Sequence, residues 1–157
     1  MSEINEVKVV LNGKDLKIGI VVSRFNSIVT ESLLSGAVSQ LEVLSVASKN
    51  ITVVRVPGAF EIPGVLKVLH DSGKYDALIA LGAVIRGETP HFDVVVNGVT
   101  SGTAAIAGLG KIPVAFGVLT TDTVDQAMNR AGLKCGNKGA ECAAAAVEMA
   151  ELYRKLK

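Results

Sequence analysis

The chain has 157 residues, a formal net charge of +1, no tryptophan, two tyrosines and four phenylalanines. This length suits one domain, expected to span residues 1–157, and the small charge and few stacking aromatics argue against a nucleic-acid or anionic membrane partner. Hydrophobic residues make up 49% of the chain and the mean hydropathy is +0.43, but the apolar runs are shorter than the ~20 residues of a membrane span.

The apolar excess predicts that the chain buries surface against copies of itself, as a homo-oligomer. Glu3 stands where a signal peptide would carry basic residues, and no apolar core follows it, so we expect a cytoplasmic protein.

The cysteines, Cys135 and Cys142, are expected to be free thiols. No further ligands are spaced around them for a metal site.

Short continuous apolar runs, typical of strands buried on both faces, alternate along the chain with segments of helical period. Residues 7–11 are a spare apolar run with no helix after it, which we expect to add to a neighbouring subunit's sheet. Segment 92–110 is ambiguous, because residues 94–96 resemble a strand whereas the alternation of the chain favours a crossover helix. The other elements are expected in this order: strand 17–23, helix 27–44, strand 51–56, helix 61–71, strand 77–84, strand 112–119, helix 123–131 capped by Thr123, and helix 137–156 capped by Asn137.

This alternation predicts an α/β fold, a three-layer α/β/α sandwich around a four-stranded parallel sheet plus the N-terminal strand. In such sheets ligands bind beyond the carboxyl ends of the strands. The polar clusters of the sequence follow the expected strands, so we expect them to meet at that edge.

The clearest cluster follows the strand at 77–84. Between residues 77 and 121 the only charged residues are Arg86, Glu88, Asp93 and Lys111, and three of these stand beside His91. Charges are costly in an apolar neighbourhood unless they are paired or used. We therefore interpret this run as a site in which His91 transfers protons, the alternative being a structural histidine. The other histidine, His70, is expected on the surface.

Three further segments leave alternatives open. Phe25 either stacks on a flat heterocycle or tucks into the core. Glu61 either contacts a ligand or only favours the start of a helix. The glycine-rich basic loop of residues 130–141 either holds a phosphate or only connects two helices. Nucleotide-binding glycine motifs are not present in the sequence.

Five sequence motifs resemble those of lumazine synthases. They are Ser-Arg-Phe-Asn at 23–26, Val-Pro-Gly-Ala-Phe-Glu-Ile-Pro at 56–63, Gly-Ala-Val-Ile-Arg-Gly-Glu-Thr-Pro-His-Phe at 82–92, Phe-Gly-Val-Leu-Thr-Thr at 116–121 and Arg-Ala-Gly-Leu-Lys-Cys-Gly-Asn-Lys-Gly at 130–139. The match extends from Lys17 to Leu156. It implies a flavodoxin-like fold and a transferase of the penultimate step of riboflavin biosynthesis. Such enzymes condense 5-amino-6-(D-ribitylamino)uracil with 3,4-dihydroxy-2-butanone 4-phosphate to 6,7-dimethyl-8-ribityllumazine, phosphate and water, with no cofactor or metal.

The resemblance also implies roles for single residues. His91 would be the catalytic proton-transfer residue. The pyrimidine and ribityl groups would be bound by Phe25, Ala59, Phe60, Glu61, Ala83, Val84, Ile85 and, from the neighbouring subunit, Phe116. The phosphate would be held by Glu88, Thr89 and Arg130, with Lys138 and Glu141 completing the charged surroundings. Arg86 and Asp93 are then left to structural ion pairing.

The family's assembly implies further partners. Its members form pentamers, and many bacterial members stack twelve of them into an icosahedral shell of sixty subunits that can enclose riboflavin synthase. The short connection at 134–138 favours the shell. Leu133, Cys135 and segment 98–103 depart from the family's pattern and affect expectations of loop packing and assembly. The alternative function is a non-catalytic shell protein of this fold that binds lumazine or flavin.

Overall fold

In the computed structural model, which describes residues 3–134 and 136–157, a four-stranded sheet forms the centre of the molecule. All strand pairs are parallel and the spatial order is β2-β1-β3-β4. The strands are β1 (Ile18–Ser23), β2 (Ile51–Val56), β3 (Ala77–Ile85) and β4 (Val114–Thr121). The predicted four-stranded parallel sheet is therefore confirmed.

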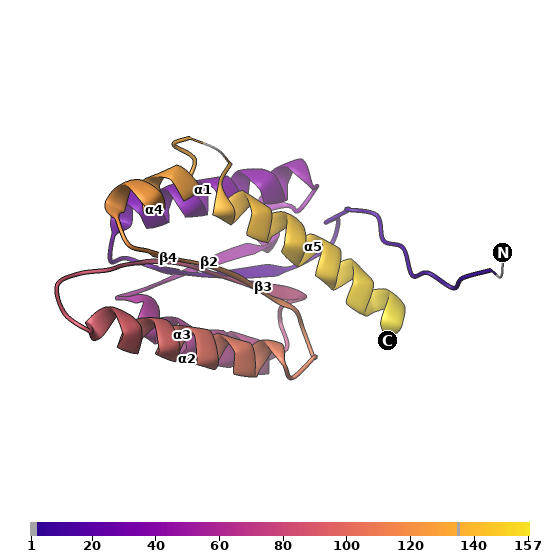
Figure 1. The fold of residues 1–157 in the computed structure, drawn as a ribbon. Coiled ribbons are helices and arrows are strands. Elements are labelled where there is room, and N and C mark those ends of the chain that lie inside the picture. Colours follow the sequence, from indigo (N-terminus) through magenta and orange to yellow (C-terminus); the bar gives the residue numbers. More distant parts are fainter. Residues whose placement is uncertain (1–2, 135) are drawn as a thin grey trace.

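Helices cover both faces of this sheet. They are α1 (Ser27–Val43), α2 (Ile62–Ser72), α3 (His91–Ala107), α4 (Val124–Arg130) and α5 (Lys138–Leu156), with short 3₁₀ turns η1 (Ser48–Asn50) and η2 (Ala59–Glu61). Figure 1 shows α1, α4 and α5 on one face and α2 and α3 on the other. The ambiguous segment is thus the crossover helix α3, as the parallel pairing of β3 with β4 requires. The three-layer α/β/α sandwich is confirmed.

The core is divided into two halves by the sheet. Ile79 and Leu81 of β3 pack with α1 and α5, while Leu78 and Ala80 pack with α2 and α3. Alternate residues of a strand point to opposite faces. A strand covered on both sides therefore favours apolar residues at successive positions. This is why β3 is a continuous apolar run and β1 is apolar up to its last residue, Ser23.

The predicted caps are present. The Thr123 side chain accepts a hydrogen bond from the backbone N–H of Gln126, whose own side chain completes a capping box. The Asn137 side chain accepts from Ala140 N–H at 3.1 Å, which begins α5. Its Nδ2 also donates to the carbonyl oxygens of Ser32 and Ala131. This one amide therefore joins the start of α5 to the body of α1 and to the end of α4.

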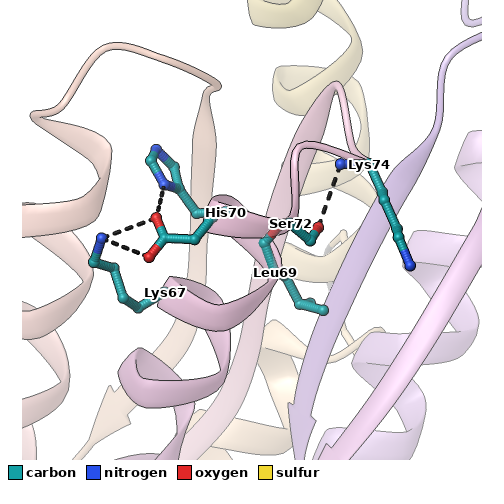
Figure 2. Close-up of polar contacts among 6 residues, drawn as sticks. Lys67, Leu69, His70, Ser72 and Lys74 are labelled. Atoms are coloured by element: carbon teal, nitrogen blue, oxygen red, sulfur yellow. Dashed lines mark hydrogen bonds and ion pairs between the residues drawn. The ribbon is translucent and has the colours of Figure 1, made fainter.

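The prediction that His70 lies on the surface is wrong, since only 4% of this residue is exposed. It follows Ile62 and Leu66 at intervals of one helical turn, so it continues the buried face of α2. Its Nδ1 lies 3.0 Å from Asp71 Oδ1. Figure 2 shows the Lys67 ammonium and the His70 ring directed at the same carboxylate. The pKa of Asp71 is lowered most by its hydrogen bonds with Lys67 and next by the one with His70.

Residues 7–11 form no strand within the described part of the chain, and Val7, Val10 and Leu11 are exposed. Their addition to a neighbouring sheet stays a prediction.

Cys142 is a free, buried thiol, and burial raises its pKa to about 11. The expectation for Cys135 falls outside the described residues. Among those residues, the helices include none of the length and apolarity needed to span a bilayer.

The contact of α1 with α5 yields a stability prediction. A Cβ on Gly139 would lie 1.9 Å from the Leu33 carbonyl oxygen, a backbone atom that cannot rotate away. Gly139→Ala should therefore lower the free energy of unfolding by at least about 1–3 kcal/mol, measured by urea denaturation. Gly64→Ala is the control, because no atom lies within 4 Å of its added Cβ and Ala favours a helix. Equal stability of the two variants would contradict this account of the packing.

Candidate active site

A cleft of about 710 Å³ opens beyond the carboxyl ends of β1, β2 and β3. The loops that follow these strands and the first turns of α3 form its walls. Its lining residues are Phe25, Asn26, Pro57, Gly58, Ala59, Phe60, Glu61, Ala83, Val84, Ile85, Gly87, Thr89, His91, Phe92, Val94 and Val95. The clusters that follow these three strands in the sequence therefore meet at one edge of the sheet, as parallel topology requires.

The loop after β1 presents Phe25 to this cleft. The residue is 72% exposed, so the alternative of a phenylalanine in the core is wrong. Backbone N–H groups of Arg24 and Phe25 donate to the carbonyl oxygens of Val56 and Pro57 at 2.8 and 3.1 Å. The exposed ring is thus carried by a loop that is tied to the end of the neighbouring strand.

The loop after β2 supplies a second aromatic wall. Ala59 is buried in η2, whereas Phe60 is 58% exposed and packs against α3. A Cβ on Gly98 would come within 2.6 Å of the Phe60 ring, and a Cβ on Gly102 within 2.6 Å of Pro63. Segment 98–103 therefore has a packing role, because its glycines let α3 approach the cleft wall.

Strand β3 ends with an incompletely paired backbone edge. Its pairing with β1 stops at Val22 and Leu81, whereas its pairing with β4 continues to Ile85 and Thr121. Residues 83–85 line the cleft. The Ala83 carbonyl oxygen already accepts a hydrogen bond from Asn26 Nδ2. The rest of this edge can offer main-chain donors and acceptors to a ligand, in a cleft that is otherwise largely apolar.

The charged run after β3 is fixed by Arg86. Its Nε donates to Asp122 Oδ1 at 2.9 Å, its Nη1 lies 3.9 Å from Asp93 Oδ1, and its guanidinium lies 4.3 Å from the centre of the Phe92 ring. The hydrogen bond that Arg86 donates to Asp122 raises the pKa of Arg86 above its ordinary value. The predicted structural ion pairing of Arg86 and Asp93 is confirmed, with Asp122 as the closer partner.

This bracing positions the residues that follow. His91 is exposed and begins α3, and its backbone N–H lies 3.4 Å from Thr89 Oγ1. His91 and Thr89 both line the cleft. An exposed imidazole in a cleft can exchange protons with a ligand, which a satisfied core histidine could not do.

The remaining predicted site residues lie apart from the cleft of their own chain. Glu88 is exposed on the same loop but outside the lining. Phe116 is on edge strand β4 and 36% exposed, Arg130 ends α4, and Lys138 pairs with Glu141 at 3.7 Å at the start of α5. Helices α4 and α5 cover the face of the sheet opposite α2 and α3 (Figure 1).

Several lining residues have no binding role among those predicted from the sequence. Val94 and Val95 follow His91 by three and four positions on α3, so their side chains belong to the same helical face. The helical period of residues 91–95 would have predicted that both valines share a face with His91. Asn26 belongs to a quoted motif, but its role depends on a contact with residue 83 that no local pattern reveals.

The fold and the cleft define a class of protein. A parallel α/β sandwich with aromatics, free backbone and an exposed histidine beyond its strand ends is typical of an enzyme that acts on a flat, polar small molecule. The comparisons with known proteins give the family. The family model described as 6,7-dimethyl-8-ribityllumazine synthase matches residues 15–154. A curated 6,7-dimethyl-8-ribityllumazine synthase of Kosmotoga olearia is 56% identical over 144 residues, covering 92% of each chain. The chain belongs to the 6,7-dimethyl-8-ribityllumazine synthase family.

The bracing by Arg86 can be tested without substrate. Arg86→Gln removes the ion pairs to Asp122 and Asp93, so backbone amides of residues 86–91 should exchange with solvent faster, by about an order of magnitude. Hydrogen exchange followed by mass spectrometry measures this. Arg55 on edge strand β2 is exposed to a similar extent as Arg86 and pairs with Glu31 of α1. Arg55→Gln should therefore leave exchange at residues 86–91 unchanged. Unaltered exchange in Arg86→Gln would show that the ion pairs do not order the loop.

Proposed function

We propose that this chain catalyses the condensation of 5-amino-6-(D-ribitylamino)uracil with 3,4-dihydroxy-2-butanone 4-phosphate, giving 6,7-dimethyl-8-ribityllumazine, phosphate and two waters. Membership of the family supports the reaction. The observation that carries the proposal is the single cleft in which Phe25, residues 59–61, residues 83–85 and His91 meet. These are the residues to which the motifs of the sequence assign the pyrimidine and the proton transfer.

The cleft has the features that a ribitylamino-pyrimidine needs. The exposed Phe25 ring offers an apolar face on which the heterocycle stacks. The backbone of residues 83–85 offers hydrogen bonds to its polar edge. Residues 59–61, with the Glu61 carboxylate at the wall, are suited to the hydroxyl groups of the ribityl chain.

The second substrate needs a phosphate site and a proton shuttle. We assign the shuttle to His91, because an exposed imidazole in the cleft can both give and take a proton as the imine forms and phosphate departs. We assign the phosphate to Thr89 and Glu88 of the same loop with Arg130. Lys138 and Glu141 would complete the charged surroundings. A guanidinium is suited to the departing phosphate by charge and by its paired N–H donors.

This assignment requires more than one copy of the chain. Phe116, Arg130 and Lys138 do not line the cleft of their own chain, so we propose that Phe116 and the basic residues reach the cleft from a neighbouring subunit. Edge strand β4 and large exposed apolar side chains support this assembly. The latter include Ile28, Val43, Val68, Val94, Leu109, Val124, Leu133 and Leu156.

For the size of the assembly we propose a pentamer, and a shell of twelve pentamers built from it. In this proposal residues 7–11 extend a neighbour's sheet, riboflavin synthase is a candidate for enclosure in the shell, and the protein works in the cytoplasm. Light scattering and electron micrographs of the purified protein separate a single chain, a pentamer and a shell. A monomer with full activity would contradict the shared site.

The reaction is tested by mixing the purified protein with both substrates and following lumazine absorbance. Product formation above the spontaneous rate is expected. Binding of the product without any acceleration would instead identify a non-catalytic lumazine-binding protein, and would overturn the proposed activity.

His91→Gln tests the proton shuttle. Removing a general acid–base should lower kcat by about 10²–10⁴-fold, as measured in the same absorbance assay. Affinity for the lumazine product, measured by fluorescence titration, should stay within about twofold, because the stacking ring and the strand edge are retained. An unchanged kcat would exclude His91 from proton transfer.

Arg130→Ala tests the shared phosphate site. Loss of the guanidinium should raise the KM for the butanone phosphate by at least about tenfold, since charge-assisted hydrogen bonds are the strong ones, with little change in the KM for the pyrimidine. Arg55→Ala, on the edge strand β2, is the control and should alter neither KM. Equal effects of Arg130→Ala on both substrates would remove this residue from the phosphate role.

A further inference from the structure

The end of β3 has an edge that its neighbours leave open. The ladder between β1 and β3 stops at Val22 and Leu81, four residues before β3 ends at Ile85. On the other side, pairing with β4 continues to Thr121. The part of β3 that lines the cleft is thus held by strand pairing on its β4 side alone, and its other edge needs a partner.

Asn26 supplies that partner. Its Nδ2 donates to the carbonyl oxygen of Ala83 at 2.9 Å, in a partly buried position. Asn26 lies three residues after the last residue of β1. Ala83 lies two residues after Leu81, the last residue of β3 that pairs with β1. The side-chain amide therefore continues the connection between β1 and β3 where the backbones no longer pair.

The backbone of Asn26 explains why an asparagine stands here. Its φ of 62° and ψ of 48° are left-handed, a conformation that Asn adopts far more readily than most residues with a side chain. Its carbonyl oxygen accepts from the N–H groups of Val29 and Thr30 at 3.0 Å, which begins α1. Glycine would satisfy this turn, but only asparagine also provides an amide donor for Ala83.

The contact joins the two sides of the proposed pyrimidine subsite. Phe25, directly before Asn26, carries the exposed ring, and its N–H donates to the Pro57 carbonyl oxygen. The Asn26 amide fixes the same loop to Ala83, the first of the three β3 residues in the cleft wall. Resting on the proposed function, we infer that Asn26 is a positioning residue that sets the separation between the stacking ring of Phe25 and the backbone edge of residues 83–85, and so determines affinity for the pyrimidine substrate.

Two variants separate the amide from the turn. Asn26→Gly keeps the left-handed conformation and loses the donor. Asn26→Asp keeps the shape, and its negative charge suits the start of a helix, but a carboxylate cannot donate to the Ala83 oxygen at pH 7. Both variants should raise the KM for the pyrimidine by about tenfold, the effect of one lost hydrogen bond in a site. The KM for the butanone phosphate should stay within about twofold.

A second readout does not depend on turnover. Hydrogen exchange should become faster at residues 83–86 in both variants, and fluorescence titration should show weaker binding of the lumazine product by about the same factor as the KM. Ser32→Ala is the control, because it removes a side-chain hydrogen bond to Ile28 in the same helix, outside the cleft lining. It should change neither the ratio of the two KM values nor exchange at residues 83–86.

The outcomes distinguish this inference from the proposed function. A wild-type protein that does not accelerate lumazine formation overturns the proposed function. If wild type is active, an unchanged pyrimidine KM in both variants, or an equal rise in both KM values, overturns the role of Asn26. A role confined to starting α1 would lower the urea midpoint of Asn26→Gly and leave the two KM values in their wild-type ratio.

Discussion

The burial of β3 on both faces is the constraint on which the rest of the structure depends. Residues 77–84 are all buried, with α1 and α5 on one side and α2 and α3 on the other. A strand in this position can carry no charge along its length. The free-energy cost of burying an unpaired charge is far larger than the stabilisation from one apolar contact. Polar chemistry is therefore confined to the ends of the sheet. The charged run that begins at Arg86 stands where the buried strand ends.

The same constraint explains what the sequence could predict. Two-sided burial makes β3 and nearly all of β1 continuous apolar runs, so the strands and the α/β class were readable from the sequence. It also made Phe25, Glu61 and His91 identifiable, since each follows a strand whose carboxyl end meets the others at one edge. The expectation for His70 failed because this residue, although next to the exposed Asp71, lies one turn after Leu66 on the buried face of α2.

The part that the sequence could not place depends on tertiary contacts and, in the proposed assembly, on contacts between copies of the chain. Arg130 and Lys138 belong to motifs as clear as that of His91, yet their helices lie on the opposite face of the sheet from α3 (Figure 1). Likewise, the hydrogen bond from Asn26 to Ala83 joins residues 57 positions apart. No periodicity encodes such a contact, whereas the left-handed turn that makes it possible is a local property of asparagine.

Close backbone approach at glycines positions the walls of the cleft. Gly98 allows the Phe60 ring to lie against α3, and Gly102 does the same for Pro63. In α5, Gly139 brings the helix start against the Leu33 carbonyl. Packing of this kind leaves little room for adjustment, since protein interiors are close-packed and an added methyl group must displace its neighbours. The aromatic walls are thus held by α3 and by hydrogen-bonded loops, and they can be rigid although their outer surfaces are exposed. A rigid, half-open wall would suit the proposed site between subunits, because in that proposal each copy presents its half of the site before the other arrives.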